Sequence, residues 1–431
     1  MDTAPRRFEI VIVGGGAGGV ELAARLGRRL GAAGRDKILL VDCSPRHIWK
    51  PTLHEIAAGT MDASQEGLSY LSVARRNHFS FALGELRDVD AAAREIVLSA
   101  LDDDKGEAIL PERRLSYRWL VLATGCGSNL FGTPGAAEHA HVLESADDAE
   151  RFRRHLLVAF TRSAYSHAQR LELVIVGGGA TGVELSAELR ESHAEALGSI
   201  GPEFGFDFGI TVVEAANRIL NGLPQPMSEH AASTLKALNI GVRTGTTVLE
   251  VHADALTTSE GTLPADLTVW AAGIQAPERN ASFGLEVNRR NQFVVNDRLE
   301  ASAPDVYAMG DCSACPWRDG QDVPARAQAA HQQADYLDET FARLLAGQRH
   351  EEPFRYRDFG SLVSLGENRG VGNVMSGLSD KNHFVGGVLA KLMYMSLHLN
   401  HHRVVIGSVA TAVLALARLL QRRISGRVKL H

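Results

Sequence analysis

The chain has 431 residues, a hydrophobic fraction of 45% and a formal net charge of −6. This hydrophobic content supports complete cores, so the composition excludes a disordered chain, and the length predicts two or three domains. Four cysteines are too few for a disulfide scaffold and suit a reducing cytoplasm, and we expect no nucleic-acid partner. Arg6 and Arg7 lead directly into a six-residue strand, so we expect no signal peptide.

The first expected element is an apolar strand over residues 8–13, followed by a glycine-rich turn and a helix. The turn carries the complete pattern G-x-G-x-x-G. Gly14 permits the tight turn, Gly16 lets the backbone approach a pyrophosphate, and Gly19 lets the helix pack on the strand. The helix begins near Ala17, with its N-terminal N–H groups facing the phosphates.

A second copy of this design lies 163 residues further along the chain, with its strand over residues 171–176. Gly177, Gly179 and Gly182 repeat the pattern, and both helices open with the tripeptide Val-Glu-Leu. One such turn is a weak signal, because glycine-rich turns also occur for purely structural reasons. Two copies, each between a strand and a helix, predict two dinucleotide sites rather than duplicated structural turns.

An acidic residue ends the second strand of each unit. Asp42 follows the strand-like stretch 37–41, and Glu214 follows the stretch 210–213. A carboxylate at this place accepts hydrogen bonds from ribose hydroxyls, although each residue alone could be a solvated strand end. Arg218 is the only cation close after Glu214 that could bind the 2′-phosphate of NADPH, so the sequence favours NADH.

The rest of the first 350 residues alternates between strands and helices, which predicts an α/β fold. Two strands end in small residues, at Ala123-Thr124-Gly125 and at Ala271-Ala272-Gly273. Gly310-Asp311 closes a later strand, and a helix is expected from about residue 324 to residue 346. No low-complexity linker separates these units, so we expect tightly packed domains.

The segment from residue 381 to the end is basic and apolar, with eight Lys or Arg residues and no Asp or Glu. Its uncharged stretch, residues 404–417, has 14 residues and would extend about 21 Å as a helix. About 20 apolar residues are needed to cross a bilayer, so this stretch is too short. We expect apolar helices lying in the interface of an anionic lipid surface, against the alternatives of a core helix or an oligomer interface.

Cys312 and Cys315 form a single C-x-x-C pair. Without a second pair this is weak evidence for a redox or metal site, and structural thiols are the favoured interpretation. The 17 histidines form no recognisable metal-binding motif, so we expect no metal.

These features together resemble the flavoproteins with two dinucleotide-binding domains, the superfamily of glutathione reductase. The resemblance implies that the first turn binds FAD and the second binds NAD(P)H. It also implies that the two small-residue strand ends lie beside the cofactors, and that Asp311 accepts a hydrogen bond from the ribityl chain. The FAD domain would then be discontinuous, with the nicotinamide domain inserted into it.

The sequence is most similar to one family in that superfamily, the type II NADH:quinone oxidoreductases. The similarity covers residues 8–431. It is carried by residues 47–55 (HIWKPTLHE), 177–189 (GGGATGVELSAEL), 269–274 (VWAAGI), 307–312, 325–332 and 427–431. Ala325-Arg326 departs from the Pro or Thr of many members, which puts the rigidity of the following helix start in doubt.

The resemblance implies four regions: residues 1–146 and 279–350 for FAD, 147–278 for NADH, and 351–431 for membrane anchoring. The implied FAD ligands are Gly14, Gly16, Ala17, Gly19, Asp42, Lys50, Ala123, Thr124, Gly125, Asp311, Ala327 and Gln328. The implied NADH ligands are Gly177, Gly179, Gly182, Glu184, Glu214 and Gly273. Glu184 would lie near the stacked nicotinamide, while Gln328 and His331 would line the quinone pocket. Glu184 could instead only complement the helix dipole, and His331 could be an ordinary histidine.

The function implied is transfer of two electrons from NADH through FAD to a membrane quinone, without proton pumping. Ubiquinone and menaquinone are both compatible, as is a homodimer, and the expected location is the cytoplasmic face of a bacterial inner membrane. A disulfide reductase would need a C-x₄-C pair early in the chain, where only Cys43 occurs. A soluble ferredoxin or rubredoxin reductase would not require the basic tail, and a non-catalytic NAD-sensing flavoprotein would turn over quinone negligibly.

Overall fold

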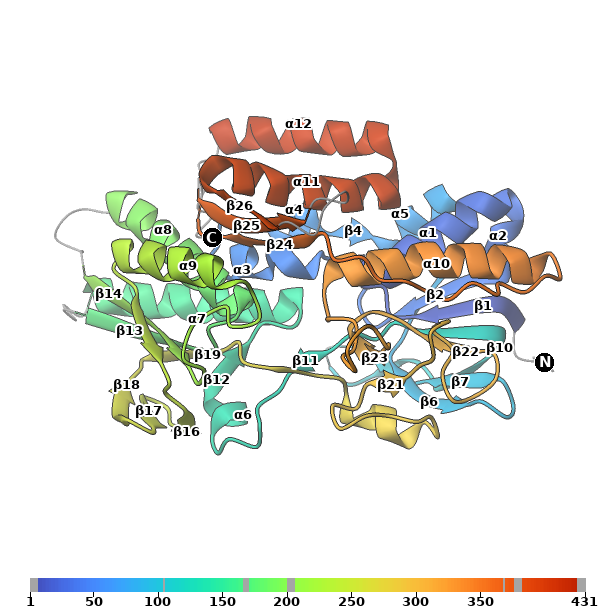
Figure 1. The fold of residues 1–431 in the computed structure, drawn as a ribbon, viewed down its shortest axis with the longest axis horizontal. Helices are drawn as coiled ribbons and strands as arrows, with labels where there is room; N and C mark the ends of the chain where they lie inside the picture. Colours follow the sequence, from blue (N-terminus) through green and yellow to red (C-terminus); the bar gives the residue numbers. More distant parts are fainter. Residues whose placement is uncertain are drawn as a thin grey trace.

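The fold consists of two Rossmann-type units side by side, with a C-terminal region across them (Figure 1). The computed structural model describes residues 7–103, 105–165, 170–199, 206–366, 369–375 and 382–424. Each expected glycine-rich turn lies between a buried strand and a helix, as the sequence predicts. The expected α/β fold class is therefore confirmed.

The first unit is built on a mixed seven-stranded sheet in the order β5-β2-β1-β10-β7-β6, with β22 paired to β10. Strands β5, β2, β1, β10 and β22 are parallel, whereas β7 and β6 are antiparallel additions. The strands are β1 (Arg7–Val13), β2 (Ile38–Asp42), β5 (Ser80–Leu83), β6 (Leu86–Asp90), β7 (Glu95–Leu98), β10 (Arg113–Leu122) and β22 (Val306–Ala308). Helices α1 (Ala17–Leu30), α5 (Tyr70–Asn77) and α10 (Ala327–Leu345) belong to the same unit.

The second unit has a fully parallel five-stranded sheet in the order β12-β19-β13-β14-β15. Its strands are β12 (Ala140–Val142), β13 (Arg170–Val176), β14 (Asp207–Glu214), β15 (Gly241–Thr244) and β19 (Leu267–Trp270). Helices α7 (Ala146–Tyr165), α8 (Ala180–Ser199) and α9 (Gln225–Ala237) accompany the sheet, and an antiparallel sheet joins β16 (Val248–Val251), β17 (Ala255–Thr258) and β18 (Gly261–Pro264). Because β12 pairs with β19, this sheet takes in residues that precede the expected boundary at residue 147.

Short elements complete the two units. They are η1 (Gly31–Ala33), α2 (Gly34–Lys37), β3 (Arg46–His47), η2 (Lys50–Thr52), α3 (Leu53–Ala57), α4 (Ala63–Glu66), β4 (Leu68–Ser69), β8 (Leu101–Asp102), β9 (Ala108–Leu110), β11 (Gly127–Ser128), α6 (Ala136–His139), β20 (Ile274–Gln275), η4 (Glu278–Ser282), β21 (Phe293–Val294), η5 (Gly310–Cys312) and β23 (Ser313–Ala314). Helix α3 packs its Leu53 and Ile56 into the core of the second unit, beside Phe152. The expectation of tightly packed domains is therefore met.

The C-terminal region begins with a three-stranded antiparallel sheet of β24 (Gly360–Ser364), β25 (Gly370–Met375) and β26 (Asn382–Gly386). Helices α11 (Gly387–Ile406) and α12 (Ser408–Ile424) follow and pack against each other, with α12 outermost (Figure 1). One expectation was wrong here. The stretch 404–417 is not one helix, because Gly407 separates α11 from α12 with a φ of +84°.

Among the described residues, no helix is both long and apolar enough to cross a membrane. The chain ending that contributed to the family resemblance, residues 427–431, lies outside the described residues, as does Lys381.

Candidate active site

The two glycine-rich turns have matching backbone geometry. Gly14 and Gly177 adopt φ values of +104° and +111°, which favour glycine, and a Cβ on either would overlap the backbone of the neighbouring strand end. A Cβ on Gly16 or Gly179 would instead meet no atom within 4 Å. Both turns thus leave open space at the second glycine, where a pyrophosphate would need to approach the backbone.

The third glycine of each turn provides the close approach between turn and helix. A Cβ on Gly19 would overlap the carbonyl oxygen of Gly14, and one on Gly182 would overlap that of Gly177. Helix α1 then begins at Ala17 with no side-chain cap and no acidic residue in its first turn, and the first turn of α8 is also free of acidic residues. The N–H groups at these helix starts are suited to an anionic ligand.

Asp42 and Glu214 hold the two turns in the same way. The Asp42 carboxylate accepts from the amides of Gly15 (2.6 Å) and Ser44 (2.8 Å). Glu214 accepts from Gly178 (2.7 Å) and Ala216 (2.8 Å). Burial raises the pKa of Asp42, while the two amides oppose that shift. Each carboxylate oxygen has further lone pairs, so both residues can also accept from ribose hydroxyls.

Arg218, which the sequence offers as a candidate 2′-phosphate ligand, is already engaged. Its guanidinium donates to the carbonyl oxygens of Leu220 (3.2 Å) and Asn221 (2.6 Å). A 2′-phosphate would therefore be repelled by the Glu214 carboxylate, while the Arg218 guanidinium is already bound to backbone carbonyls. This supports the expectation of NADH.

The structure brings together the residues expected at the flavin half of the first site. Lys50 Nζ donates to the carbonyl oxygen of Cys126 (3.0 Å), and the Cys126 thiol donates to the carbonyl oxygen of Asp311 (3.0 Å). Burial raises the pKa of the Asp311 carboxyl, and the charge of Lys50 partly offsets this shift. A side-chain hydrogen bond from Thr124 opposes the effect of burial on the pKa of the Cys312 thiol, next to Asp311. Lys50, Thr124 and Asp311 thus form a polar neighbourhood that fits a bound polar cofactor.

Glu184 lies in a buried junction of three elements. Its Oε1 accepts from the amide of Ser364 in β24 (2.9 Å), and its Oε2 lies 3.6 Å from Nδ1 of His54 in α3. Lys391 of α11 donates to the Ser364 hydroxyl (2.8 Å) and lies 3.8 Å from Glu55. Burial raises the pKa of Glu184, with His54 opposing the shift. Sequence reasoning did not find His54, Ser364 or Lys391 as its neighbours.

Gln328 joins the start of α10 to the segment that leads into β24. Its amide nitrogen donates to the Gly360 carbonyl (2.9 Å) and to Asp358 (3.2 Å), while its oxygen accepts from the amide of Phe359 (3.2 Å). Arg326 also contacts Asp358, at 3.3 Å. The helix start that lacks the family's Pro or Thr is thus fixed by side-chain contacts.

Helix α10, which begins at Ala327, contacts the turn that contains Asp311. Gln333 of α10 accepts from the amide of Gly310 (2.7 Å), which places the beginning of α10 beside the Gly310-Asp311 turn. Ala327 is the first residue of α10, and its helix start has no side-chain cap. Its backbone N–H is therefore available to a ligand on the Asp311 side.

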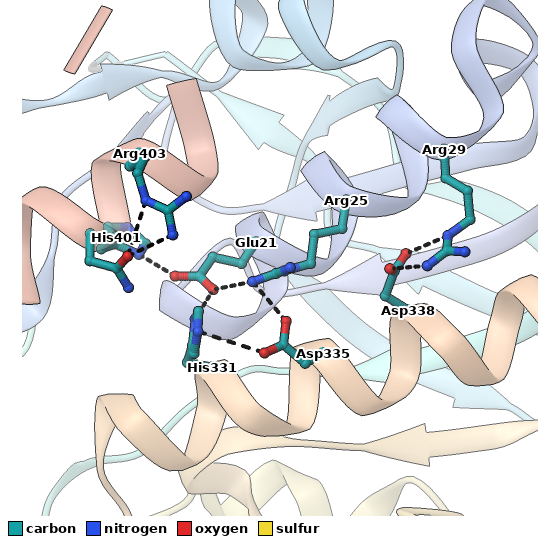
Figure 2. A network of polar contacts seen from close by, with 9 residues as sticks. Glu21, Arg25, Arg29, His331, Asp335, Asp338, His401 and Arg403 are labelled. Atoms are coloured by element: carbon teal, nitrogen blue, oxygen red, sulfur yellow. Dashed lines mark hydrogen bonds and ion pairs between the residues drawn. The ribbon is translucent and has the colours of Figure 1, made fainter. Parts of the chain in front are cut away.

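His331 takes part in a different group of residues. Its Nδ1 donates to the Glu21 carboxylate of α1, and its Nε2 lies 3.7 Å from Asp335 (Figure 2). Glu21 is buried, and sequence reasoning did not assign it a role. The repeat contained the signal, because Glu21 and Glu184 occupy the same position after their turns.

The remaining cysteine prediction concerns the C-x-x-C pair. All four cysteines are free, and Cys312 and Cys315 are buried. The Cys312 thiol donates to the carbonyl oxygens of Met309 (3.3 Å) and Leu122 (3.5 Å). In the described residues no group of three or more His, Cys, Asp or Glu is placed to hold a metal ion. These contacts support the interpretation as structural thiols.

Comparisons with known proteins agree with this geometry. Residues 8–334 match the pyridine nucleotide-disulphide oxidoreductase family. A protein of Haemophilus influenzae named type II NADH:quinone oxidoreductase is 37% identical, over 98% of this chain and 99% of its own length. The chain belongs to the type II NADH:quinone oxidoreductase family.

Two further relatives extend this result. A Synechocystis protein named demethylphylloquinone reductase NdbB is 29% identical over 91% of this chain and 92% of its own length. The structure of NDH2 from Plasmodium falciparum in complex with NADH has a TM-score of 0.82, with 99% of this chain and all of that chain covered, at 18% identity. The structural likeness confirms the expected fold over 99% of the chain.

Proposed function

We propose that this chain is an FAD-dependent NADH:quinone oxidoreductase that passes two electrons from NADH to a membrane quinone without pumping protons. The observation that carries this function is the family membership over 98% of the chain, combined with two open glycine-rich cradles that each end in a ribose-accepting carboxylate. FAD, when bound, supplies the redox chemistry by accepting hydride from NADH and delivering electrons to the quinone. The protein supplies position, electrostatics and exclusion of water.

On the first site, we assign Gly14, Gly16, Ala17, Gly19 and Asp42 to the adenosine half of FAD. Lys50, Ala123, Thr124, Gly125, Asp311 and Ala327 are assigned to the flavin half. Gly177, Gly179, Gly182, Glu214 and Gly273 are assigned to NADH. The supporting observations are the open second glycines and the polar neighbourhood of Lys50, Thr124 and Asp311.

Glu184 and Gln328 are assigned to opposite half-reactions. Glu184 follows the NADH turn directly, so we place it at the nicotinamide side. Gln328, at the start of α10 and bonded to the segment before β24, is placed at the quinone side, together with His331 one turn further along the helix. The contact of His331 with Glu21 gives that residue a structural role as well.

We further propose that α11 and α12 hold the enzyme on the cytoplasmic face of a bacterial inner membrane without crossing it. Large apolar side chains remain exposed on both helices, namely Val388, Leu389, Leu392, Met395, Leu397, Val409, Val413, Leu416, Leu419 and Leu420. Apolar residues with neighbouring Lys or Arg suit the interface of an anionic membrane. Because a long-chain quinone stays in the bilayer, this position would bring the flavin site to its substrate.

The activity is tested with purified protein, NADH and a short-chain quinone, followed by NADH absorbance. We expect rapid NADH oxidation that depends on the quinone, and little transfer to ferredoxin or rubredoxin. Negligible turnover with quinone, despite bound flavin, would instead indicate an NAD-sensing flavoprotein. Sealed vesicles carrying the enzyme and a pH-sensitive dye test the absence of proton pumping.

The membrane surface is tested by one charged substitution and a matched control. Leu416→Glu places a carboxylate on α12, whereas Leu249→Glu places one on β16, at similar exposures of 58% and 52%. Only Leu416→Glu should reduce sedimentation with anionic vesicles. If it instead converts a dimer to a monomer in size-exclusion chromatography, with vesicle binding unchanged, this face is a homodimer interface.

A further inference from the structure

A chain of buried hydrogen bonds connects α11 to the first glycine-rich turn. His401 Nδ1 donates to Glu21 Oε1 (2.7 Å), and the Nε2 atoms of His401 and His47 lie 2.7 Å apart. His47 Nδ1 in turn donates to the carbonyl oxygen of Gly15 (2.9 Å). Glu21, His47 and His401 are all at most 4% exposed. The chain therefore runs through the core from a C-terminal helix to the turn that precedes α1.

Gly15 is held at both its N–H group and its carbonyl oxygen. Its N–H donates to Asp42, and its carbonyl oxygen accepts from the hydroxyl of Tyr70 (2.6 Å) as well as from His47. Gly15 lies between Gly14 and Gly16, the positions that shape the cradle. A change at His47 would thus be felt directly in the backbone that faces the cofactor.

Counting donors fixes the protonation of this chain. The Gly15 carbonyl and the Glu21 carboxylate can only accept, so His47 Nδ1 and His401 Nδ1 must both carry hydrogen. The contact between the two Nε2 atoms needs one more proton, because two lone pairs at 2.7 Å would repel. The histidine pair therefore holds three N–H hydrogens and a single positive charge, which the Glu21 carboxylate balances.

The pKa values are consistent with this count. Burial alone would raise the pKa of Glu21. The hydrogen bonds from His331 and His401 outweigh burial and lower this pKa to about 2, so the carboxylate is ionised at neutral pH. Burial and the neighbouring His401 lower the pKa of His47 to about 3, so His47 is neutral. The hydrogen bond to Glu21 raises the pKa of His331, the second histidine that donates to this carboxylate.

Other charged groups surround the chain on every packed element. Arg25 of α1 lies 3.9 Å from Glu21 and 2.7 Å from Asp335 of α10 (Figure 2). His331 of α10 binds the second oxygen of Glu21. On α11, His398 and His402 have pKa values lowered by burial to about 2 and about 4, so both are neutral. Of these α11 histidines, His401 is the one that contacts both Glu21 and His47.

We propose that Glu21, His401 and His47 form a positioning relay, in which one buried proton fixes the Gly15 carbonyl and makes FAD retention depend on the seating of α11. The proposal rests on assigning the first cradle to FAD. Loss of the shared proton at higher pH breaks one hydrogen bond in the relay and loosens the turn. A hydrogen bond to a charged group contributes on the order of 10-fold or more to an equilibrium, so the change should be measurable.

The test measures FAD release from the purified holoenzyme by the rise in free-flavin fluorescence after dilution, between pH 6 and pH 9. In the unmodified protein, release should accelerate about 10-fold as the pH rises. Glu21→Gln removes the charge that holds the proton, so release should be fast and nearly independent of pH. His401→Gln should give the same flat profile, and it replaces Glu21→Gln if that variant does not fold.

Asp338→Asn is the matched control. Asp338 pairs with Arg29 in the same interface between α1 and α10, but it has no link to Gly15 (Figure 2). This variant should keep the unmodified pH profile. Amide hydrogen exchange of the peptide around residues 14–22, measured with FAD bound, should increase in Glu21→Gln and His401→Gln and not in Asp338→Asn.

Three outcomes would overturn the relay. One is a flat pH profile in the unmodified protein, and another is a retained profile in Glu21→Gln or His401→Gln. The third is an equal effect of Asp338→Asn, which would indicate only general stabilisation of the interface. Purified protein that binds no flavin at all would contradict the proposed function instead, so the two failures are distinguishable.

Discussion

The two glycine-rich units share a turn, a helix start and a carboxylate at the same position, yet the pKa values of the two carboxylates shift in opposite directions. Glu21 and Glu184 both follow the third glycine by two residues, and both are buried. The pKa of Glu21 is lowered to about 2, whereas that of Glu184 is raised. Equivalent positions in a repeat therefore have pKa shifts of opposite direction.

The difference comes from what the later parts of the chain bring to each carboxylate. Burial raises the pKa of both. Glu21 receives two histidine donors, from α10 and α11, which more than offset burial. Glu184 receives one backbone amide and a histidine nitrogen 3.6 Å away, which do not. The repeated motif thus sets the shape of each cradle, and the C-terminal region differentiates the two units.

The largest expected effect is on stability. Glu21→Gln removes the buried carboxylate that both His331 and His401 bind, and the free energy of unfolding should fall by about 3 kcal/mol. Glu184→Gln keeps an oxygen for the Ser364 amide and removes a buried carboxylate, so its cost should be below about 1 kcal/mol. Denaturation with urea at pH 7 measures both. A larger loss for Glu184→Gln than for Glu21→Gln would contradict the comparison.

The pH dependence of these two variants should run in opposite directions. The lowered pKa of Glu21 contributes stability that is complete above 4.5 and is lost as the pH falls towards about 2. The gap between the unmodified protein and Glu21→Gln should therefore narrow in acid. The raised pKa of Glu184 contributes stability below its unfolded value that is lost as the pH rises. As the pH rises, the stability of Glu184→Gln relative to the unmodified protein should therefore increase.

The next prediction concerns the choice of nicotinamide cofactor. Glu214→Arg replaces a ribose acceptor with a partner for the 2′-phosphate, so the ratio of kcat/KM for NADH over NADPH should fall about 100-fold. Steady-state assays with the two cofactors measure this ratio. Arg218→Ala is the control, because its guanidinium is bound to backbone carbonyls and should not affect the ratio. Equal kcat/KM values in the unmodified protein would contradict the assignment of Glu214.

Sequence reasoning could predict what is local. The two turns and the carboxylates that end β2 and β14 lie within short segments whose spacing is fixed by strand, turn and helix. It could not predict the partners of Glu21 and Glu184, because His401 and Ser364 are separated from them by 380 and 180 positions. The break at Gly407 was also missed, since an uncharged stretch does not reveal a single glycine with positive φ as a helix end.

A further prediction distinguishes the role of Gln328 from that of its structural neighbour Gln332. Gln328 and Gln332 each bond the segment 357–360, Gln328 at Phe359 and Gly360 and Gln332 at Arg357. Gln328→Ala should slow flavin reoxidation by quinone about 10-fold, because the lost amide would orient the quinone. Gln332→Ala should lose comparable contacts to this segment without affecting reoxidation. Stopped-flow measurements of both half-reactions decide between catalytic and structural roles.

The smallest expected effect returns to the two carboxylates and concerns hydride transfer. With FAD in excess, Glu184→Gln should slow the bleaching of flavin by NADH a few-fold, because the residue directly follows the proposed NADH turn. Glu21→Gln should leave bleaching unchanged under the same conditions, since its hydrogen bonds lead to the FAD turn and to α10. Stopped-flow absorbance at saturating NADH compares the two variants. If both slow bleaching equally, the carboxylates differ only in their surroundings and the division of roles between the two units is wrong.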